Sequence, residues 1–267
     1  MWESFLPGVP SLPVLVAMFM VVLCRVSAVV MTVPGLGETD VPMTLRAALA
    51  FCVTFTVLPV VQNRLVAPCA DALHNPAFAL AIVAGELLCG AFIGWLARLI
   101  GLAMVIATQI MAVMIGLSNV LQPDPQMGVG STALSHMAVM FVPVAFLTTG
   151  LYALPLEAID GSYNLFPPGH MILLGDMAKS VAVATTLIFQ LGFQLATPFV
   201  LIGLLFPAML GVLNRLLPTI QVYLVGMPVQ ILGGVFLMAI LIHVTTDVWQ
   251  ERATDLLQGL PGLVFRH

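Results

Sequence analysis

Long apolar stretches, separated by short segments rich in glycine and proline, make up most of the chain. The hydrocarbon core of a bilayer is about 30 Å thick and needs roughly 20 apolar residues per helix. Stretches of this kind occupy residues 12–33 and 43–61, with the turn-rich segment 34–42 between them and the polar segment 62–76 after them. The pattern predicts two membrane-type helices joined by a turn.

The next apolar stretch, residues 77–121, is too long for one straight membrane span. Glu86 and Arg98 interrupt it, so it forms either two helices with a tight break at 98–101 or one very long helix. It ends at residues 122–126, Gln-Pro-Asp-Pro-Gln, because a helix does not continue through two closely spaced prolines. The choice between one helix and two decides whether the chain has six or seven helices.

The second half of the chain repeats the alternation of apolar runs and breaks. A run at 132–159 is followed by loop-type sequence at 160–169, a helix at 176–196, a stretch to 213 that Pro198 and Pro207 punctuate, a break at 214–218, a last helix at 221–246 and a charged tail. We therefore predict an all-α, integral membrane-type protein with six to seven long helices in one domain, residues 1–267.

Composition supports the membrane class and excludes others. Hydrophobic residues make up 61% of the chain and charged residues only 7%, whereas a typical soluble domain has about 25% charged residues. A disordered chain would combine low hydrophobicity with high net charge. The net charge of −4 leaves no basic surface for nucleic acid.

Three charged side chains, Arg25, Glu86 and Arg98, lie inside apolar runs. A charge at bilayer depth costs at least about 2.5–3.5 kcal/mol and therefore faces protein or water. Glu86 and Arg98 are too far apart in sequence to pair along one helix, so they meet only if the chain folds back. Structural pairing is the leading interpretation, with ion transport and burial inside a larger assembly as the alternatives.

Catalytic and metal-binding patterns are weak. Ser131, Ser135 and His136 are neighbours without a triad pattern, and His243 and Asp247 supply only two potential metal ligands at i,i+4. The chain contains no H-E-x-x-H, no G-x-S-x-G and no phosphate-binding loop rich in glycine. We predict no enzymatic activity, no cofactor and no metal.

Small residues indicate close helix packing. Gly90 and Gly94 form a G-x-x-x-G pair in an apolar helix, and Gly203, Pro207 and Gly211 form a second ladder at four-residue spacing. Such residues let helix backbones approach in a membrane. Gln190 and Gln194 put two amides on one helix face, which should hydrogen-bond to a neighbouring helix or line a wet cavity.

A segment bounded by glycine and proline interrupts the long apolar stretch. Irregular backbone at membrane depth is tolerated only where protein buries it or water lines it, so this segment is either a channel constriction or a plain surface loop. Its candidate residues are Ile115, Gly116, Leu117, Ser118, Asn119, Val120, Leu121, Gln122, Asp124 and Pro125.

In its spaced motifs the chain resembles the FliR family of flagellar biosynthetic proteins and, more distantly, its counterparts in virulence-type type III secretion. The resemblance covers nearly the whole chain. Its elements are Arg25 followed by Val33-Pro34, Gly37, Pro42 and Arg46; Glu86 opening E-x-x-x-G-x-x-x-G; Gly116-Leu-Ser leading to Asp124-Pro125; Ser162 followed by Pro168-Gly169; and Gly211-Val-Leu-Asn-Arg-Leu-Leu-Pro218 followed by Val222-Tyr223, Gly226, Pro228 and Gly233.

The resemblance implies a non-enzymatic subunit of the flagellar type III protein export gate in the bacterial inner membrane, at the flagellar basal body. It implies helices in hairpins within a helical gate assembly, with FliP- and FliQ-like subunits, FlhB- and FlhA-like proteins and unfolded export substrates as partners. The segment that contains Gly116 would close the channel. Arg25, Arg46, Glu86, Arg98 and Arg215 would be buried or serve assembly, with Arg46 and Arg215 at helix ends.

Two alternatives remain at this point. An injectisome-type export subunit shares the same family pattern. A secondary ion or solute transporter would use Glu86 and Arg25 in an ion pathway and would move a solute without partner proteins. An intramembrane hydrolase has no identifiable nucleophile and base.

Overall fold

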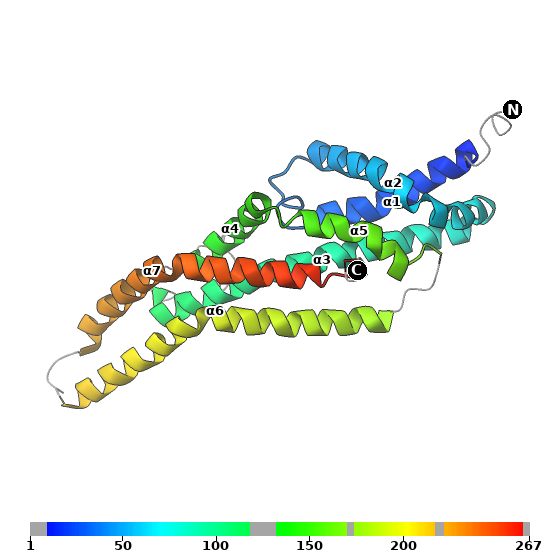
Figure 1. Ribbon diagram of the computed structural model, residues 1–267. Coiled ribbons are helices and arrows are strands. Elements are labelled where there is room, and N and C mark those ends of the chain that lie inside the picture. Colours follow the sequence, from blue (N-terminus) through cyan, green and yellow to red (C-terminus); the bar gives the residue numbers. More distant parts are fainter. Residues whose placement is uncertain (1–9, 118–131, 170–173, 217–221, 264–267) are drawn as a thin grey trace. The chain divides into compact units, whose positions relative to one another are not determined.

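The structure is a computed structural model, and it describes residues 10–117, 132–169, 174–216 and 222–263 (Figure 1). Seven α-helices occupy this part of the chain, which confirms the prediction of an all-α protein with six to seven helices. Their bounds are α1 Leu12–Thr32, α2 Met43–His74, α3 Pro76–Ile115, α4 Ala133–Thr149, α5 Ala153–Leu165, α6 Leu174–Leu216 and α7 Val222–Gln258.

The helices belong to two compact units whose boundaries pass through α3, α4, α6 and α7. Unit 1 consists of Met1–Arg98, Pro143–Ala182 and Asp255–His267, and unit 2 consists of Leu99–Val142 and Val183–Thr254. Each unit is described by itself below.

In unit 1, α1 and α2 form an antiparallel hairpin, and α5 packs against both (Figure 1). The ring of Phe19 in α1 contacts two rings of α2, with centroid distances of 5.8 Å to Phe51 and 5.0 Å to Phe55. α1 also buries Val22, Val26 and other valines at helical spacing. This apolar face explains why α1 ends up in the core of the unit rather than at its surface.

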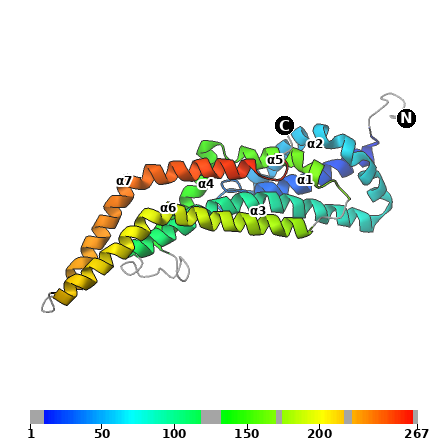
Figure 2. The ribbon, with the colours of Figure 1, turned by 60° about the horizontal axis from the view of Figure 1, so that its bottom comes forward.

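In unit 2, the second half of α6 and the first half of α7 lie side by side in both views (Figures 1 and 2). The end of α3 lies against both helices, because Gly203 of α6 lies against Met114 and Gly234 of α7 lies against Ile115. Small residues thus allow the helices to approach closely at these two points.

Five described helices are long and apolar enough to cross a membrane, namely α1, α2, α3, α6 and α7. The pair α4 and α5 passes the same test as one broken span with a bend of 72°, which raises the possible number of spans to six. The structure therefore agrees with an integral membrane protein.

Several helices run further than the apolar pattern predicts. The sequence places the end of the second helix near residue 61, yet α2 continues through Pro59 and Pro68 to His74. Its buried face continues as well, since Val61, Leu65 and Cys69 follow one another at four-residue spacing with no exposed surface. Tertiary packing of this face outweighs the polar residues and the proline that suggested a break.

The last two helices also run further than the sequence predicts. Pro198 and Pro207 lie inside α6, which continues to Leu216 rather than breaking. The last helix, predicted to end at 246, runs on to Gln258. Trp249, Ala253 and Leu257, again spaced by four and fully buried, carry this extension.

The run predicted at 132–159 is two helices in the structure. α4 ends at Thr149, and Gly150 takes a φ of +76°, a left-handed conformation that favours glycine. α5 then extends to Leu165, into the segment predicted to be a loop. For the stretch 77–121, the structure selects the single long helix, α3, which ends before Gly116 at a φ of +89°.

Candidate functional site

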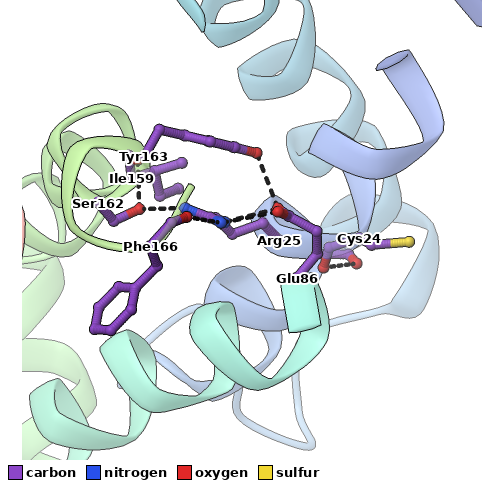
Figure 3. Close-up of polar contacts among 8 residues, drawn as sticks. Cys24, Arg25, Glu86, Ile159, Ser162, Tyr163 and Phe166 are labelled. Atoms are coloured by element: carbon purple, nitrogen blue, oxygen red, sulfur yellow. Dashed lines mark hydrogen bonds and ion pairs between the residues drawn. The ribbon is translucent and has the colours of Figure 1, made fainter. Parts of the chain in front are cut away.

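The charged centre of unit 1 is an ion pair between Arg25 of α1 and Glu86 of α3 (Figure 3). The guanidinium binds the carboxylate at two points: Nε donates to Oε2 at 2.7 Å and Nη2 donates to Oε1 at 2.8 Å. The two side chains are only 1% and 2% exposed. This two-point geometry is the strong, directional form of an arginine–carboxylate pair.

Residues of α5 complete the cluster. Arg25 Nη1 donates to the hydroxyl of Ser162 at 2.9 Å, and Nη2 donates to the backbone carbonyl of Phe166 at 2.9 Å. The Tyr163 hydroxyl donates to Glu86 at 3.1 Å, while its ring lies under the guanidinium at 3.7 Å. One arginine therefore connects three helices and also caps the C-terminal end of α5, where a cation is favourable.

The sequence explains why Glu86 reaches Arg25. Glu86, Gly90 and Gly94 lie at four-residue spacing on one face of α3, and a Cβ on Gly90 would collide with the backbone carbonyl oxygen of Arg25. A Cβ on Gly94 would likewise collide with Thr32 of α1. The two glycines let the backbones of α1 and α3 touch, which brings the carboxylate one turn earlier into contact with the guanidinium.

The polar atoms of this cluster form their hydrogen bonds with one another and with nearby backbone carbonyls. Within the described ranges, no buried side-chain nitrogen or oxygen lacks a hydrogen-bond partner. Both carboxylate oxygens of Glu86 accept hydrogen bonds from Arg25, and the Ser162 hydroxyl donates a hydrogen bond to the Ile159 carbonyl oxygen at 2.6 Å. Such a pair fixes helix positions rather than offering a free carboxylate to a moving ion.

The other charges grouped with this pair lie in different surroundings. Arg98 contacts Glu38 at 3.6 Å, and its side chain is 46% exposed, so this chain alone does not bury it. Arg46 is half-buried and binds backbone oxygens of the turn before α2: Nη2 donates to Glu38 at 2.8 Å and to Val41 at 2.7 Å. Arg215 is exposed in the last turn of α6.

In unit 2, three residues hold the end of α3. The Gln230 amide of α7 donates to the Met114 carbonyl at 2.8 Å. This carbonyl belongs to the last turn of α3, where the helix itself provides no partner. A Cβ on Gly203 would lie 2.7 Å from the Met114 Cβ, and a Cβ on Gly234 would collide with Ile115. α6 and α7 therefore both pack closely against Met114 and Ile115, the last two residues of α3.

The candidate constriction begins where the end of α3 packs against α6 and α7. Ile115 ends α3, Gly116 donates its N–H to the Val113 carbonyl at 3.1 Å, and Leu117 follows in a short turn. The remaining candidate residues of the segment, Ser118 to Pro125, lie outside the described residues. After them, Thr132 donates its N–H to the Gln109 side chain at 3.2 Å and to the Ser135 hydroxyl at 3.1 Å.

The other packing candidates differ from one another. Gly203 makes the tight contact described above, but a Cβ on Gly211 would meet no atom within 4 Å, so Gly211 lies open in this chain. Gln190 and Gln194 are both exposed on α6. No cluster of three or more potential metal ligands occurs among the residues that the structure describes.

Sequence reasoning missed Tyr163 and Gln230 as contributors. Tyr163 lies in the segment predicted to be a loop, although Pro155, Ile159 and Tyr163 continue one buried face at four-residue spacing. This spacing is typical of a helix and could have placed Tyr163 on the buried face of α5. Gln230 is a single amide in an apolar run, a pattern that predicts an interhelical hydrogen bond in a membrane but not its partner.

Comparison with known proteins identifies the family. The sequence model of the bacterial export proteins, family 1, matches residues 16–256. The chain belongs to this family. Members of this family are structural channel components and not enzymes, as the sequence predicts for this chain.

Individual relatives agree with this membership. The chain is 31% identical to the flagellar biosynthetic protein FliR of Caulobacter vibrioides over 236 residues, which cover 88% of this chain and 92% of the relative. It is 27% identical to the protein of the same name from Escherichia coli over 242 residues, 91% of this chain and 90% of the relative. The surface presentation of antigens protein SpaR of Shigella sonnei is 31% identical over 120 residues, 44% of this chain and 45% of the relative. The flagellar relatives therefore match about twice as much of the chain.

Proposed function

We propose that this chain is a non-enzymatic subunit of the flagellar type III protein export gate. The match of the export family over residues 16–256 carries the proposal. Coverage of about nine-tenths of the flagellar relatives favours the flagellar system over the injectisome, because the SpaR match covers less than half of this chain.

The buried ion pair favours a gate subunit over the transporter alternative. An ion pathway needs a carboxylate that water or an ion reaches, whereas Glu86 is 2% exposed and binds Arg25 through both oxygens. The pair instead sets the position of α1, α3 and α5 inside unit 1. A subunit that must keep its shape while substrates pass beside it benefits from such a rigid centre.

The finer proposal concerns closure of the channel. The segment from Ile115 to Pro125 closes the channel between export events, and Gly116 provides the bend at which it leaves α3. The φ of +89° at Gly116 and the packing of α6 and α7 against Met114 and Ile115 support this role, because they fix where the segment begins.

Partners and location follow from the gate assignment. FliP- and FliQ-like subunits complete the channel, FlhB- and FlhA-like proteins associate with it, and unfolded export substrates pass through it, in the bacterial inner membrane at the flagellar basal body. The exposed apolar side chains of α6 and α7, such as Leu204, Leu205 and Phe236, provide surface for lipid or for these subunits. Arg215, which is exposed in this chain, would pair with an acidic group of a partner subunit.

A secretion assay tests the main proposal. A flagellated bacterium that lacks its own FliR-family protein is given this chain, and secretion of flagellar substrates is measured. The result expected is restored secretion when the remaining gate subunits from the same source are present. Failure under that condition, with the chain present in the membrane, would refute the proposal.

Deletion of residues 118–125 tests the closing segment separately. We expect increased ion leak across the membrane with unchanged assembly of the complex. An assembled gate with unchanged leak would contradict the closing role and leave the export-gate function standing.

A further inference from the structure

The chain folds back on α5 after α7 ends. Residues 259–263, which we call the C-terminal turn, follow α7 directly, and the end of α7 lies beside α5 in both views (Figures 1 and 2). Two backbone hydrogen bonds shape the turn, from Leu260 to the Leu257 carbonyl at 3.0 Å and from Leu263 to the Leu260 carbonyl at 3.1 Å. Both α5 and the C-terminal turn belong to unit 1.

The C-terminal turn touches α5 through glycine on both sides. Gly262 is buried and has a φ of +110°, which favours glycine. A Cβ on Gly262 would collide with the Ala158 carbonyl oxygen of α5, and a Cβ on Gly161 would collide with the Gly262 carbonyl oxygen. The two backbones therefore lie in direct contact, and any side chain at either position would separate them.

Helix α5 depends on such outside contacts for its position. It has only 13 residues, and a helix shorter than about 12–15 residues is marginal in water by itself. Tyr152 at its N-cap makes no side-chain hydrogen bond to the first turn, and that turn contains no acidic residue. Packing against α1 and α2, the bonds from Arg25 and the C-terminal turn supply the support that α5 lacks.

Helix α5 is also the separable member of the charged cluster. Arg25 binds both oxygens of Glu86 through Nε and Nη2, so the link between α1 and α3 does not need α5. The bonds from Arg25 to Ser162 and to the Phe166 carbonyl are additional to this pair. Ser162 directly follows Gly161, so Arg25 and the C-terminal turn hold neighbouring residues of one helix.

A hollow of about 250 Å³ lies beside the C-terminal turn. Gly259 and Pro261 of the turn line it, together with Phe92 of α3 and with Leu165 and Phe166 at the end of α5. Side chains that border such a space lose the dispersion contacts that a filled core provides. Close packing between the turn and α5 is thus concentrated at the glycine contact.

From these observations we propose that the C-terminal turn is a strap that holds α5 in a closed position. With the strap in place, α5 keeps Ser162 and Tyr163 against Arg25. When the strap lifts, α5 opens as one unit, whereas α1 and α3 stay joined through the pair of Arg25 and Glu86. This conformational step lies within unit 1 and does not rest on the export function.

Hydrogen exchange of backbone amides, measured by mass spectrometry on the full chain in mild detergent, detects local opening helix by helix. Gly161→Ala and Gly262→Ala each place a Cβ in the glycine contact. Deletion of residues 261–267 removes the contact without adding a clash. Gly175→Ala, at the start of α6 in the same unit, meets no atom within 4 Å and is the matched control.

The proposal predicts that amides of α5 exchange about tenfold faster or more in the two alanine variants and in the deletion, because each loses the close contact. Exchange in α1 should stay as in the parent protein, and Gly175→Ala should match the parent throughout. Gly161→Ala should add nothing in the deletion background, since both changes act on one contact.

Three results would overturn the proposal. Unchanged exchange of α5 in all three variants would mean that the C-terminal turn does not hold this helix. Equal acceleration in α1 and α5 would mean that the turn supports the whole unit and that α5 does not open separately. A further acceleration by Gly161→Ala in the deletion background would place its effect outside the contact with Gly262.

Discussion

Replacing Glu86 by glutamine tests the buried cluster of unit 1. Glutamine keeps the shape of the side chain but removes its charge and turns one of two acceptors into a donor. The carboxylate accepts hydrogen bonds from Arg25 Nε, from Arg25 Nη2 and from the Tyr163 hydroxyl. The glutamine amide would face one of these donors, and the Arg25 charge would remain buried without a counter-charge.

The size of the effect follows from the burial of the pair. Removing one member of a buried, hydrogen-bonded ion pair costs about 3–5 kcal/mol. This cost lowers the ratio of folded to unfolded protein by roughly 10²- to 10³-fold or more. An exposed pair is worth only about 0–1 kcal/mol because water screens both charges.

The chain supplies a matched control for this prediction. Arg98→Gln removes the partner of Glu38 in a pair whose arginine side chain is 46% exposed. Free energies of unfolding are measured for both variants by denaturant titration in mild detergent. We expect a large loss for Glu86→Gln and a loss below about 1 kcal/mol for Arg98→Gln.

A double variant shows whether the loss comes from the unpaired charge. Arg25→Met combined with Glu86→Leu removes both charges, and replacing a buried pair by apolar side chains is often close to neutral. We therefore expect the double variant to be more stable than Glu86→Gln. If Glu86→Gln and Arg98→Gln lose the same small amount, or if the double variant is the least stable of all, the account of the cluster is wrong.

Three further changes test the helix contacts by the same unfolding measurement. Gly90→Ala drives a Cβ into the Arg25 carbonyl and should lower the free energy of unfolding by about 1–3 kcal/mol. Its control, Gly211→Ala, meets open space and should not destabilise the protein. Equal effects of the two changes would contradict the close approach of α1 and α3. Gln230→Leu leaves the Met114 carbonyl unpaired and should lower the free energy of unfolding by about 1–3 kcal/mol. Its control, Gln190→Leu, lies at an exposed position and should have little effect. Unchanged stability of Gln230→Leu would rule out the interhelical hydrogen bond. Gly116→Ala should cost about 1–2 kcal/mol from its positive φ alone, since the Ile231 side chain would lie 3.9 Å from the new Cβ, at ordinary contact distance; no loss would mean that the left-handed bend is absent.

The helical architecture could be predicted from the sequence because long apolar runs are a strong and local signal. Helix ends were harder. Pro68, Pro198 and Pro207 lie where the sequence suggested breaks, yet α2 and α6 pass through them. Packing of a buried face decides such cases, and the face at Trp249, Ala253 and Leu257 shows how a four-residue spacing continues beyond the apolar run.

The candidate site could be predicted only in part. The cost of burying charge singles out Arg25 and Glu86, but they are 61 residues apart and nothing local pairs them. The contribution of α5 depends on where that helix ends, which the Gly- and Pro-rich composition of 160–169 obscures. Gln230 reaches α3 across 116 residues, so only the folded chain reveals its partner.

The export-gate function is tested most directly by the mass of the particle that this chain forms with its neighbours. The chain is co-expressed with FliP- and FliQ-like proteins from the same source, solubilised in mild detergent and purified through a tag on this chain alone. The account predicts one defined, large complex that contains all three proteins. A lone, monodisperse chain from membranes in which all three proteins are present would contradict it.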